Sequence, residues 1–257
     1  MSVKLHYNIF GKGYPLVIMH GLFGSSRNWQ SVAKTLAENY QVITPDLRNH
    51  GMSDHADSMT YAEMAEDIQQ LLDELSLEHI TLMGHSMGGK VAMINALLYA
   101  DKIDKLIALD IAPVDYQHKY GKIFYVMQNL LLDKIKNRNE AEEILNKQLD
   151  DVFLSRFLLQ NLIRTDDRFQ WRINLPAIQD NIDIIRSFPE LDDDQEFDKP
   201  ALFLGGENSH FIQAEHQQAI LRYFPKADVD HIKNAGHMLH IEQPQSVLDR
   251  LRLFLQT

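Results

Sequence analysis

The expected fold depends on the stretch His79-Ile80-Thr81-Leu82-Met83-Gly84-His85-Ser86-Met87-Gly88-Gly89. In it an apolar run leads into a Gly-x-Ser-x-Gly motif, and a helical pattern begins directly afterwards. A sharp strand–turn–helix connection of this kind holds its serine in a strained backbone conformation. Gly84 and Gly88 are needed because a Cβ at either position would collide with the chain. The turn projects the Ser86 hydroxyl above a sheet, at the positive end of the helix, so Ser86 is the predicted nucleophile.

Similar short apolar runs, each stopped by polar or glycine residues, occur on both sides of this stretch. They cover residues 16–19, 41–46, 105–109, 200–204 and 227–232. Continuous apolar runs suit strands of a parallel sheet that is buried on both faces. Helical patterns lie between them; the clearest starts with a capping box at Thr60 and Glu63, and the last opens with Pro244. The alternation predicts an α/β fold with a doubly wound, mostly parallel sheet.

This alternation stops after Pro113. Residues 115–195 show no convincing strand but several helical stretches, such as residues 141–162. We therefore expect one core, formed by residues 1–114 and 196–257, that is interrupted by a helical cap insertion of residues 115–195. The acidic run at residues 192–194 is expected to be a solvated loop.

Composition limits the possible functions. The 257 residues include no cysteine, which excludes disulfides, thiol nucleophiles and cysteine-ligated zinc. The net charge of −11 argues against nucleic acid or an anionic membrane as partner, although a few local Lys or Arg residues could still hold a small anion. No apolar stretch suits membrane insertion and the N-terminus lacks a signal-peptide pattern, so we expect a cytoplasmic protein. No metal-ligand spacing or dinucleotide fingerprint is apparent, and no cofactor is expected.

A serine nucleophile needs a base, which is usually histidine. Among twelve histidines, His237 is the best placed, because it follows the last predicted strand in Asn234-Ala235-Gly236-His237-Met238. The carboxyl ends of parallel strands meet at one edge of a sheet, where α/β sites form. The fold would therefore bring His237 to Ser86.

The third member of such a site is a carboxylate that orients the imidazole. Its usual place is the turn after the penultimate strand, where this chain has Ser209. Two acids could compensate. Asp110 ends the strand after the nucleophile's helix, at the same sheet edge, and is favoured; Glu207 is the alternative.

The developing oxyanion also needs hydrogen-bond donors. We expect one to be the backbone N–H of Met87 and another to come from the loop after the first core strand. The preferred donor there is the N–H of Leu22, with Phe23 as the alternative. The cap is expected to supply an apolar pocket from Phe124, Phe153, Phe157 and Trp171.

Together these motifs resemble the α/β-hydrolase family over essentially the whole chain. More narrowly, the chain resembles the bacterial YbfF-type esterases through the segments His20-Gly-Leu-Phe-Gly-Ser25, Arg48-Asn-His-Gly51, Gly84-His-Ser-Met-Gly-Gly-Lys90 and Asp110-Ile-Ala-Pro-Val-Asp-Tyr116. The resemblance implies a carboxylesterase or thioesterase that cleaves short acyl esters or acyl-CoA thioesters, with its acid at Asp110. The alternatives are a carbon–carbon bond lyase or hydrolase of the menaquinone-pathway type and a non-catalytic ligand-sensing receptor. The oligomeric state is left open.

Overall fold

The computed structural model describes residues 2–166, 168–192 and 195–256. Two residues of the acidic run at 192–194 lie outside this part of the chain, so the prediction of a solvated loop there is not tested.

A seven-stranded sheet forms the centre of the fold, in the order β1-β3-β2-β4-β5-β8-β9. The strands are β1 (Tyr7–Phe10), β2 (Tyr14–Met19), β3 (Tyr40–Pro45), β4 (Ile80–His85), β5 (Ile103–Leu109), β8 (Ala201–Gly206) and β9 (Ala227–Ile232). All neighbouring strands pair in parallel except β1, which pairs antiparallel with β3. The predicted doubly wound, mostly parallel sheet is therefore confirmed, with β1 as an additional edge strand that its sequence did not reveal.

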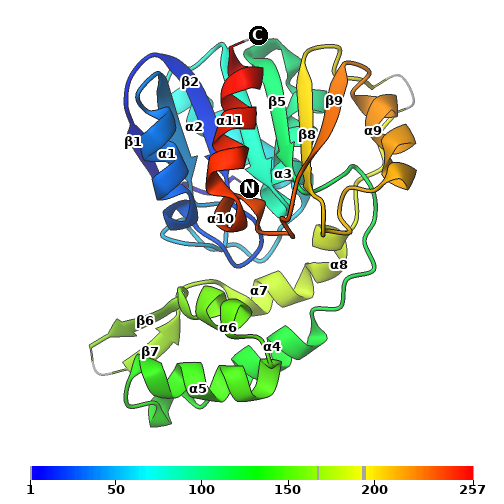
Figure 1. The fold of residues 1–257 in the computed structure, drawn as a ribbon. Coiled ribbons are helices and arrows are strands. Elements are labelled where there is room, and N and C mark those ends of the chain that lie inside the picture. Colours follow the sequence, from blue (N-terminus) through cyan, green and yellow to red (C-terminus); the bar gives the residue numbers. More distant parts are fainter. Residues whose placement is uncertain (1, 167, 193–194, 257) are drawn as a thin grey trace.

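Helices cover both faces of this sheet (Figure 1). They are α1 (Gln30–Leu36), α2 (Tyr61–Glu74), α3 (Met87–Leu98), α9 (Gln217–Tyr223), α10 (Leu239–Glu242) and α11 (Pro244–Leu255). Apolar residues of α2 and α3 pack on one face, and those of α1 and α11 pack on the other. The capping box of α2 and the first-turn proline of α11 are both present as predicted. In the described part of the chain, no helix is long and apolar enough to cross a bilayer.

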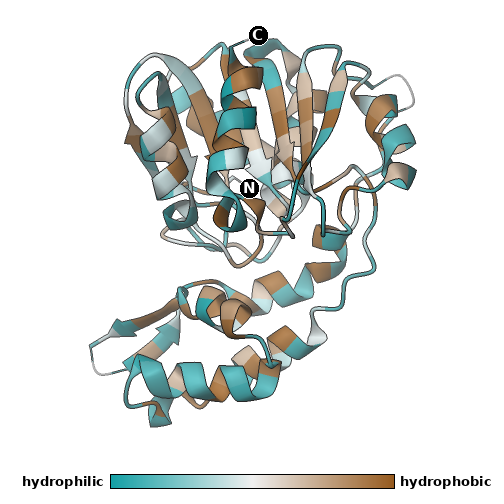
Figure 2. Cartoon of the chain, viewed as in Figure 1, coloured by the Kyte–Doolittle hydropathy of each residue, from teal (hydrophilic) through white to brown (hydrophobic). Residues whose placement is uncertain are grey.

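The segment between β5 and β8, here called the cap, forms a separate group of elements beside the core (Figure 1). It contains α4 (Gly121–Gln128), α5 (Arg138–Leu149), α6 (Val152–Leu159), β6 (Leu162–Thr165), β7 (Arg168–Trp171), α7 (Leu175–Asp180) and α8 (Ile182–Arg186). Figure 2 shows α5 as mostly hydrophilic, whereas strands β5 and β8 of the core are mostly hydrophobic.

Two expectations for the cap are wrong. The segment is not free of strands, because β6 and β7 form an antiparallel hairpin. Residues 141–162 do not form one helical stretch: Asp150 adopts a left-handed conformation with φ of 57° and ends α5. Asp151 then accepts a hydrogen bond from the N–H of Leu154 and begins α6, as short acidic side chains do at helix starts.

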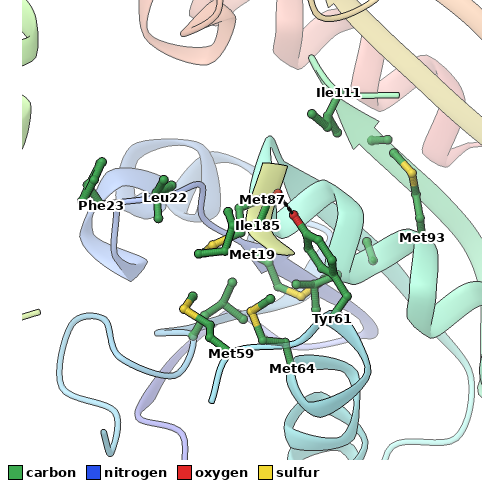
Figure 3. Close-up of a cluster of buried hydrophobic side chains, with 14 of the residues drawn as sticks. Met19, Leu22, Phe23, Met59, Tyr61, Met64, Met87, Met93, Ile111 and Ile185 are labelled. Atoms are coloured by element: carbon green, nitrogen blue, oxygen red, sulfur yellow. Dashed lines mark hydrogen bonds between the residues drawn. The ribbon is translucent and has the colours of Figure 1, made fainter. Parts of the chain in front are cut away.

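Polar groups of the core hold both ends of the cap. The buried Lys90 ammonium of α3 donates to the carbonyls of Val114 (2.8 Å), Arg186 (3.0 Å) and Ser187 (2.7 Å). Burial lowers the pKa of Lys90 to about 7. The Tyr61 hydroxyl of α2 points at α8 and donates to the Ile185 carbonyl at 2.5 Å (Figure 3). The cap is therefore joined to the core at the points where the chain leaves and returns.

Candidate active site

Ser86 lies in the sharp turn between β4 and α3. Its φ of 52° and ψ of −119° are strained for any residue with a Cβ. A Cβ on Gly84 would come within 2.1 Å of the Gly88 carbonyl oxygen, and one on Gly88 within 2.5 Å of the His20 carbonyl oxygen. The predicted requirement for both glycines is therefore confirmed. The Ser86 N–H donates to the Leu109 carbonyl at 3.0 Å, which ties the turn to the end of β5.

Asp110 follows β5 and also has a positive φ, of 49°. Its carboxylate is fully buried. One oxygen, Oδ2, accepts hydrogen bonds from His237 Nδ1 (2.7 Å) and from the Ser209 hydroxyl (2.5 Å), and Oδ1 accepts one from the Gly206 N–H (2.9 Å). With Nδ1 donating, Nε2 of His237 is the nitrogen available to accept a proton.

Glu207, the alternative acid, has no contact with this imidazole. It is exposed and accepts a hydrogen bond from the Asn234 N–H at 2.9 Å. The structure therefore brings His237 together with Asp110 and not with Glu207. Ser209, which the sequence presents only as a missing acid, is a donor to Asp110. Its signal was available, since a buried carboxylate needs donors and a hydroxyl stands at the position facing it.

His237 is held by two further side chains, whose contacts with it the sequence did not reveal. The buried His85 donates from Nε2 to the His237 carbonyl at 2.8 Å. Burial, together with the charge of His237, keeps the pKa of His85 well below its ordinary value, so this ring is neutral. The ring of Phe211 stacks on the imidazole of His237, with centroids 4.2 Å apart and planes at 25°. Both contacts restrict where the imidazole can point.

Ser86 and His237 line the same cavity. No hydrogen bond joins their side chains among the described residues. Contacts between nucleophile and base are often long in ligand-free sites and tighten when substrate binds. The arrangement is therefore compatible with proton transfer between the two groups.

The two candidate oxyanion donors in the loop after β2 are distinguished by their partners. The Phe23 N–H already donates to Nε2 of His50 at 3.1 Å, and Nδ1 of His50 donates to the Arg48 carbonyl at 2.9 Å. Burial lowers the pKa of His50 to about 3, so its ring stays neutral and accepts this bond. The Leu22 N–H has no acceptor within the described part of the chain. Met87 is the first residue of α3, where N–H groups lack intrahelical partners.

The segment of residues 46–53 supports this loop. The Asp46 carboxylate accepts hydrogen bonds from the N–H groups of Ser26 (2.6 Å) and Met52 (2.9 Å). The buried Arg48 guanidinium forms a two-point contact with Asp67, from Nε at 2.7 Å and Nη2 at 2.9 Å. These bonds fix the loop that carries Leu22 without placing a charge of this segment in the cavity.

The cavity has a volume of about 290 Å³ and a mostly apolar cap side, formed by Tyr120, Ile123, Phe153, Leu154 and Phe157. Phe153 and Phe157 therefore lie where they were predicted. Phe124 and Trp171 do not line it. Phe124 is buried behind the wall against Phe23, with ring centroids 5.8 Å apart, and Trp171 turns away to donate from Nε1 to the Met127 carbonyl at 3.0 Å. Phe124 therefore packs on the core loop that carries Phe23, and Trp171 is bonded within the cap.

The fold and this site define a class of protein. A family model described as "alpha/beta hydrolase fold" matches residues 14–244, and the chain belongs to that family. The chain is 36% identical over 94% of its length to "Esterase YbfF" of Escherichia coli (strain K12), covering 92% of that protein, which confirms the resemblance to YbfF-type esterases. It is 38% identical to "sn-1-specific diacylglycerol lipase ABHD11" of Xenopus tropicalis, over 99% of this chain and 83% of that one. A solved structure titled "Marine microorganism esterase" superposes with a TM-score of 0.95 at 38% identity, covering 98% of this chain and all of that one.

Proposed function

We propose that the protein is a serine hydrolase of ester bonds, with Ser86 as nucleophile, His237 as general base and Asp110 as the carboxylate that orients it. One observation carries this proposal: the buried Asp110 accepts the Nδ1–H of His237 at 2.7 Å. That bond sets the tautomer in which Nε2 accepts a proton, and His237 shares a cavity with the strained Ser86. The esterase and lipase names of the relatives support the same chemistry.

The reaction takes place in two steps. His237 removes the Ser86 proton as the hydroxyl oxygen attacks the substrate carbonyl, and the N–H groups of Leu22 and Met87 bind the oxyanion. The tetrahedral intermediate then expels the alcohol or thiol, which takes its proton from His237. Water, deprotonated by the same histidine, attacks the acyl-enzyme and releases the acid and free Ser86. Asp110 remains ionised and stabilises the imidazolium in both steps.

The cavity indicates the substrate class. Its volume of about 290 Å³ and its apolar cap wall suit a short to medium acyl chain. We propose acyl esters or acyl-CoA thioesters as substrates, with residues 115–195 acting as the cap over residues 1–114 and 196–257. The alternative of a carbon–carbon bond lyase or hydrolase has less support. Enzymes of that type resemble the pattern in which the acid follows the penultimate strand, and this chain has Ser209 at that position. A non-catalytic receptor would have no use for the His237–Asp110 bond.

The test is a panel of p-nitrophenyl esters and acyl-CoA thioesters, assayed with the native protein, Ser86→Ala and the control Ser31→Ala. Ser31 is an exposed serine on α1. We expect Ser86→Ala to lose at least about 1,000-fold in kcat, since removal of a serine nucleophile costs this much or more. Ser31→Ala should match the native protein. Equal rates for Ser86→Ala and the native protein on every active substrate would overturn the proposal.

A further inference from the structure

A second cavity on the boundary between core and cap carries four arginines. It has a volume of about 650 Å³, and Arg27, Arg138, Arg164 and Arg172 lie in its wall. No Asp or Glu is among the described residues that line it. The chain has 36 acidic residues against 25 basic ones, so four arginines gathered without an acid stand out from its general charge.

Arg27 and Arg172 are the pair at this site that most needs an anion. Burial and the nearby charge of Arg27 lower the pKa of Arg172, and the Asp46 carboxylate, which does not line the cavity, opposes them only in part. Nε of Arg172 is buried and has no hydrogen-bond partner within the described residues. A buried N–H without an acceptor and two like charges side by side are both unfavourable in isolation. An anion between the two guanidinium groups would accept a hydrogen bond from this N–H and would offset the repulsion between the two charges.

The other two arginines are fixed at the same cavity by other contacts. Arg138 of the cap donates to the carbonyls of Leu159 and Leu162, the latter at 3.1 Å, so its guanidinium is held at the end of α6. Arg164 of β6 lies over the ring of Phe169, 5.9 Å from its centroid. Arg138 thereby adds positive charge at the cavity without any need to move.

The cavity lined by the four arginines, here called the arginine cavity, and the cavity lined by Ser86 and His237, here called the acyl cavity, are built on the same chain segments. Three short segments contribute residues to both cavities. Phe23, Phe157 and Met238 line the acyl cavity, and Arg27, Gln160 and Ile241, three or four positions further along, line the arginine cavity. A hydrogen bond of 2.7 Å from Asn28 Nδ2 to Gln160 Oε1 crosses from core to cap at the wall of the arginine cavity. A ligand could therefore occupy both cavities by lying along the boundary between core and cap.

We infer that this cavity is a binding site for the phosphate groups of a ligand. Guanidinium groups match phosphate oxygens with two parallel hydrogen bonds, and four of them exceed what a single carboxylate needs. Two sources share this chemistry: the phosphorylated leaving group of a substrate such as an acyl-CoA, or a free phosphorylated ligand. The first source rests on the proposed function, whereas the site itself does not.

Binding is measured by titration calorimetry at low ionic strength, with pyrophosphate and adenosine 3′,5′-bisphosphate as probes and malonate as the dianion without phosphate. The full chain carrying Ser86→Ala is used, so that hydrolysis plays no part. We expect Arg172→Met and Arg27→Gln each to weaken pyrophosphate binding at least about tenfold, the effect of losing a charged hydrogen bond. Arg172→Lys should retain part of the binding, and its thermal unfolding shows whether the fold is intact. Arg168→Gln, on the same hairpin but outside the cavity wall, is the control.

Two results would overturn the site: no binding of either phosphate probe, or equal binding by the cavity variants and the control. Pyrophosphate that binds no more tightly than malonate would overturn its assignment to phosphate. The source is decided in chains with an intact Ser86, by comparing acyl-CoA with a p-nitrophenyl ester of the same acyl chain. A KM that rises about tenfold for the thioester alone in the arginine variants supports the leaving group, and unchanged kinetics support a free ligand. Hydrolysis that persists in Ser86→Ala would contradict the proposed function and leave the binding result intact.

Discussion

The two walls of the acyl cavity are built differently. On the core side the polar groups are buried and paired: Asp110 has three donors, and the loop beside Leu22 is fixed by the neutral imidazole of His50. On the cap side the wall is mostly apolar, with His118 and Asp151 as its polar members, and partly open, since Phe153 is 47% exposed. The core therefore fixes the positions of the candidate catalytic groups, and the cap determines the shape of the cavity that receives the substrate. Changes in the core should act mainly on kcat, and changes in the cap mainly on KM.

The largest effect is expected from the carboxylate of the core wall. Asp110→Asn keeps the size of the side chain but no longer stabilises the imidazolium or the required tautomer, so kcat should fall about 1,000- to 10,000-fold. Glu207→Gln is the matched control and should leave kcat unchanged, because Glu207 is bonded to Asn234. Steady-state ester hydrolysis measures both. Near-native turnover of Asp110→Asn would contradict the assignment.

Acid should destabilise the core wall before it affects the cap. Burial lowers the pKa of His50 and of His240 to about 3. Below about pH 6.5 these two histidines are protonated in the unfolded chain but stay neutral in the folded protein. The unfolding free energy is therefore fully present above that pH and falls progressively toward pH 3. At pH 5.5 each ring should cost about 1.4 kcal/mol of unfolding free energy. Urea unfolding at pH 7.5, 6.5 and 5.5 measures this loss. The unfolding free energy of His240→Phe should fall less steeply with decreasing pH than that of the native protein, and an equal pH dependence of the two would contradict the prediction.

The junction between the walls depends on Lys90. Lys90→Met removes three donors and leaves buried carbonyls at both ends of the cap, which should lower the unfolding free energy by about 2–4 kcal/mol. Tyr61→Phe removes one hydrogen bond at the same junction and should cost about 1 kcal/mol. Urea denaturation gives both numbers. A smaller loss for Lys90→Met than for Tyr61→Phe would show that the ammonium does not hold the cap.

The smallest effect is expected from the cap wall. Phe157→Ala enlarges the apolar side of the cavity and should raise KM for short esters roughly tenfold and shift preference toward longer chains, with little change in kcat. Tyr125→Ala, which removes a 64% exposed aromatic of α4, is the control. Kinetics over esters of increasing length check the shift. A fall in kcat with KM unchanged would contradict the assignment of Phe157 to substrate binding.

The sequence predicted the core more completely than the cap, for physical reasons. Strands β4 and β8 are buried over their whole length and β5 is buried and apolar from Leu106 onward, so each carries a run of mostly apolar residues. Strands β6 and β7 have only four residues each, and all of them except Leu162 are half-buried or exposed, so their sequence does not distinguish the hairpin from the end of a helix. Strand β1 is short, lies at the edge and is largely half-buried.

The site shows the same limit. Ser86 and His237 could be predicted because backbone geometry and strand ends constrain them locally. The preference for Leu22 over Phe23 agrees with the structure, but its physical reason could not be predicted, since it depends on which N–H already has a partner, and His50 lies 27 positions from Phe23. Ser209 donates to Asp110 from 99 positions away, so only its place after the penultimate strand, and no periodic pattern, could have revealed this contact. Contacts of this length leave no periodic signal in the chain.

The place of Asp110 after β5 affects how the site is assembled as the chain folds. Ser86 and Asp110 belong to one strand–helix–strand unit, β4–α3–β5, and become neighbours as soon as that short connection closes. His237, 127 positions from Asp110, arrives only when β9 has joined the far side of the sheet. Because closure entropy grows with the length of the loop, most of the entropic cost of site assembly lies in that single long-range contact. A carboxylate at position 209 would instead have placed both partners of the nucleophile far from it in chain order.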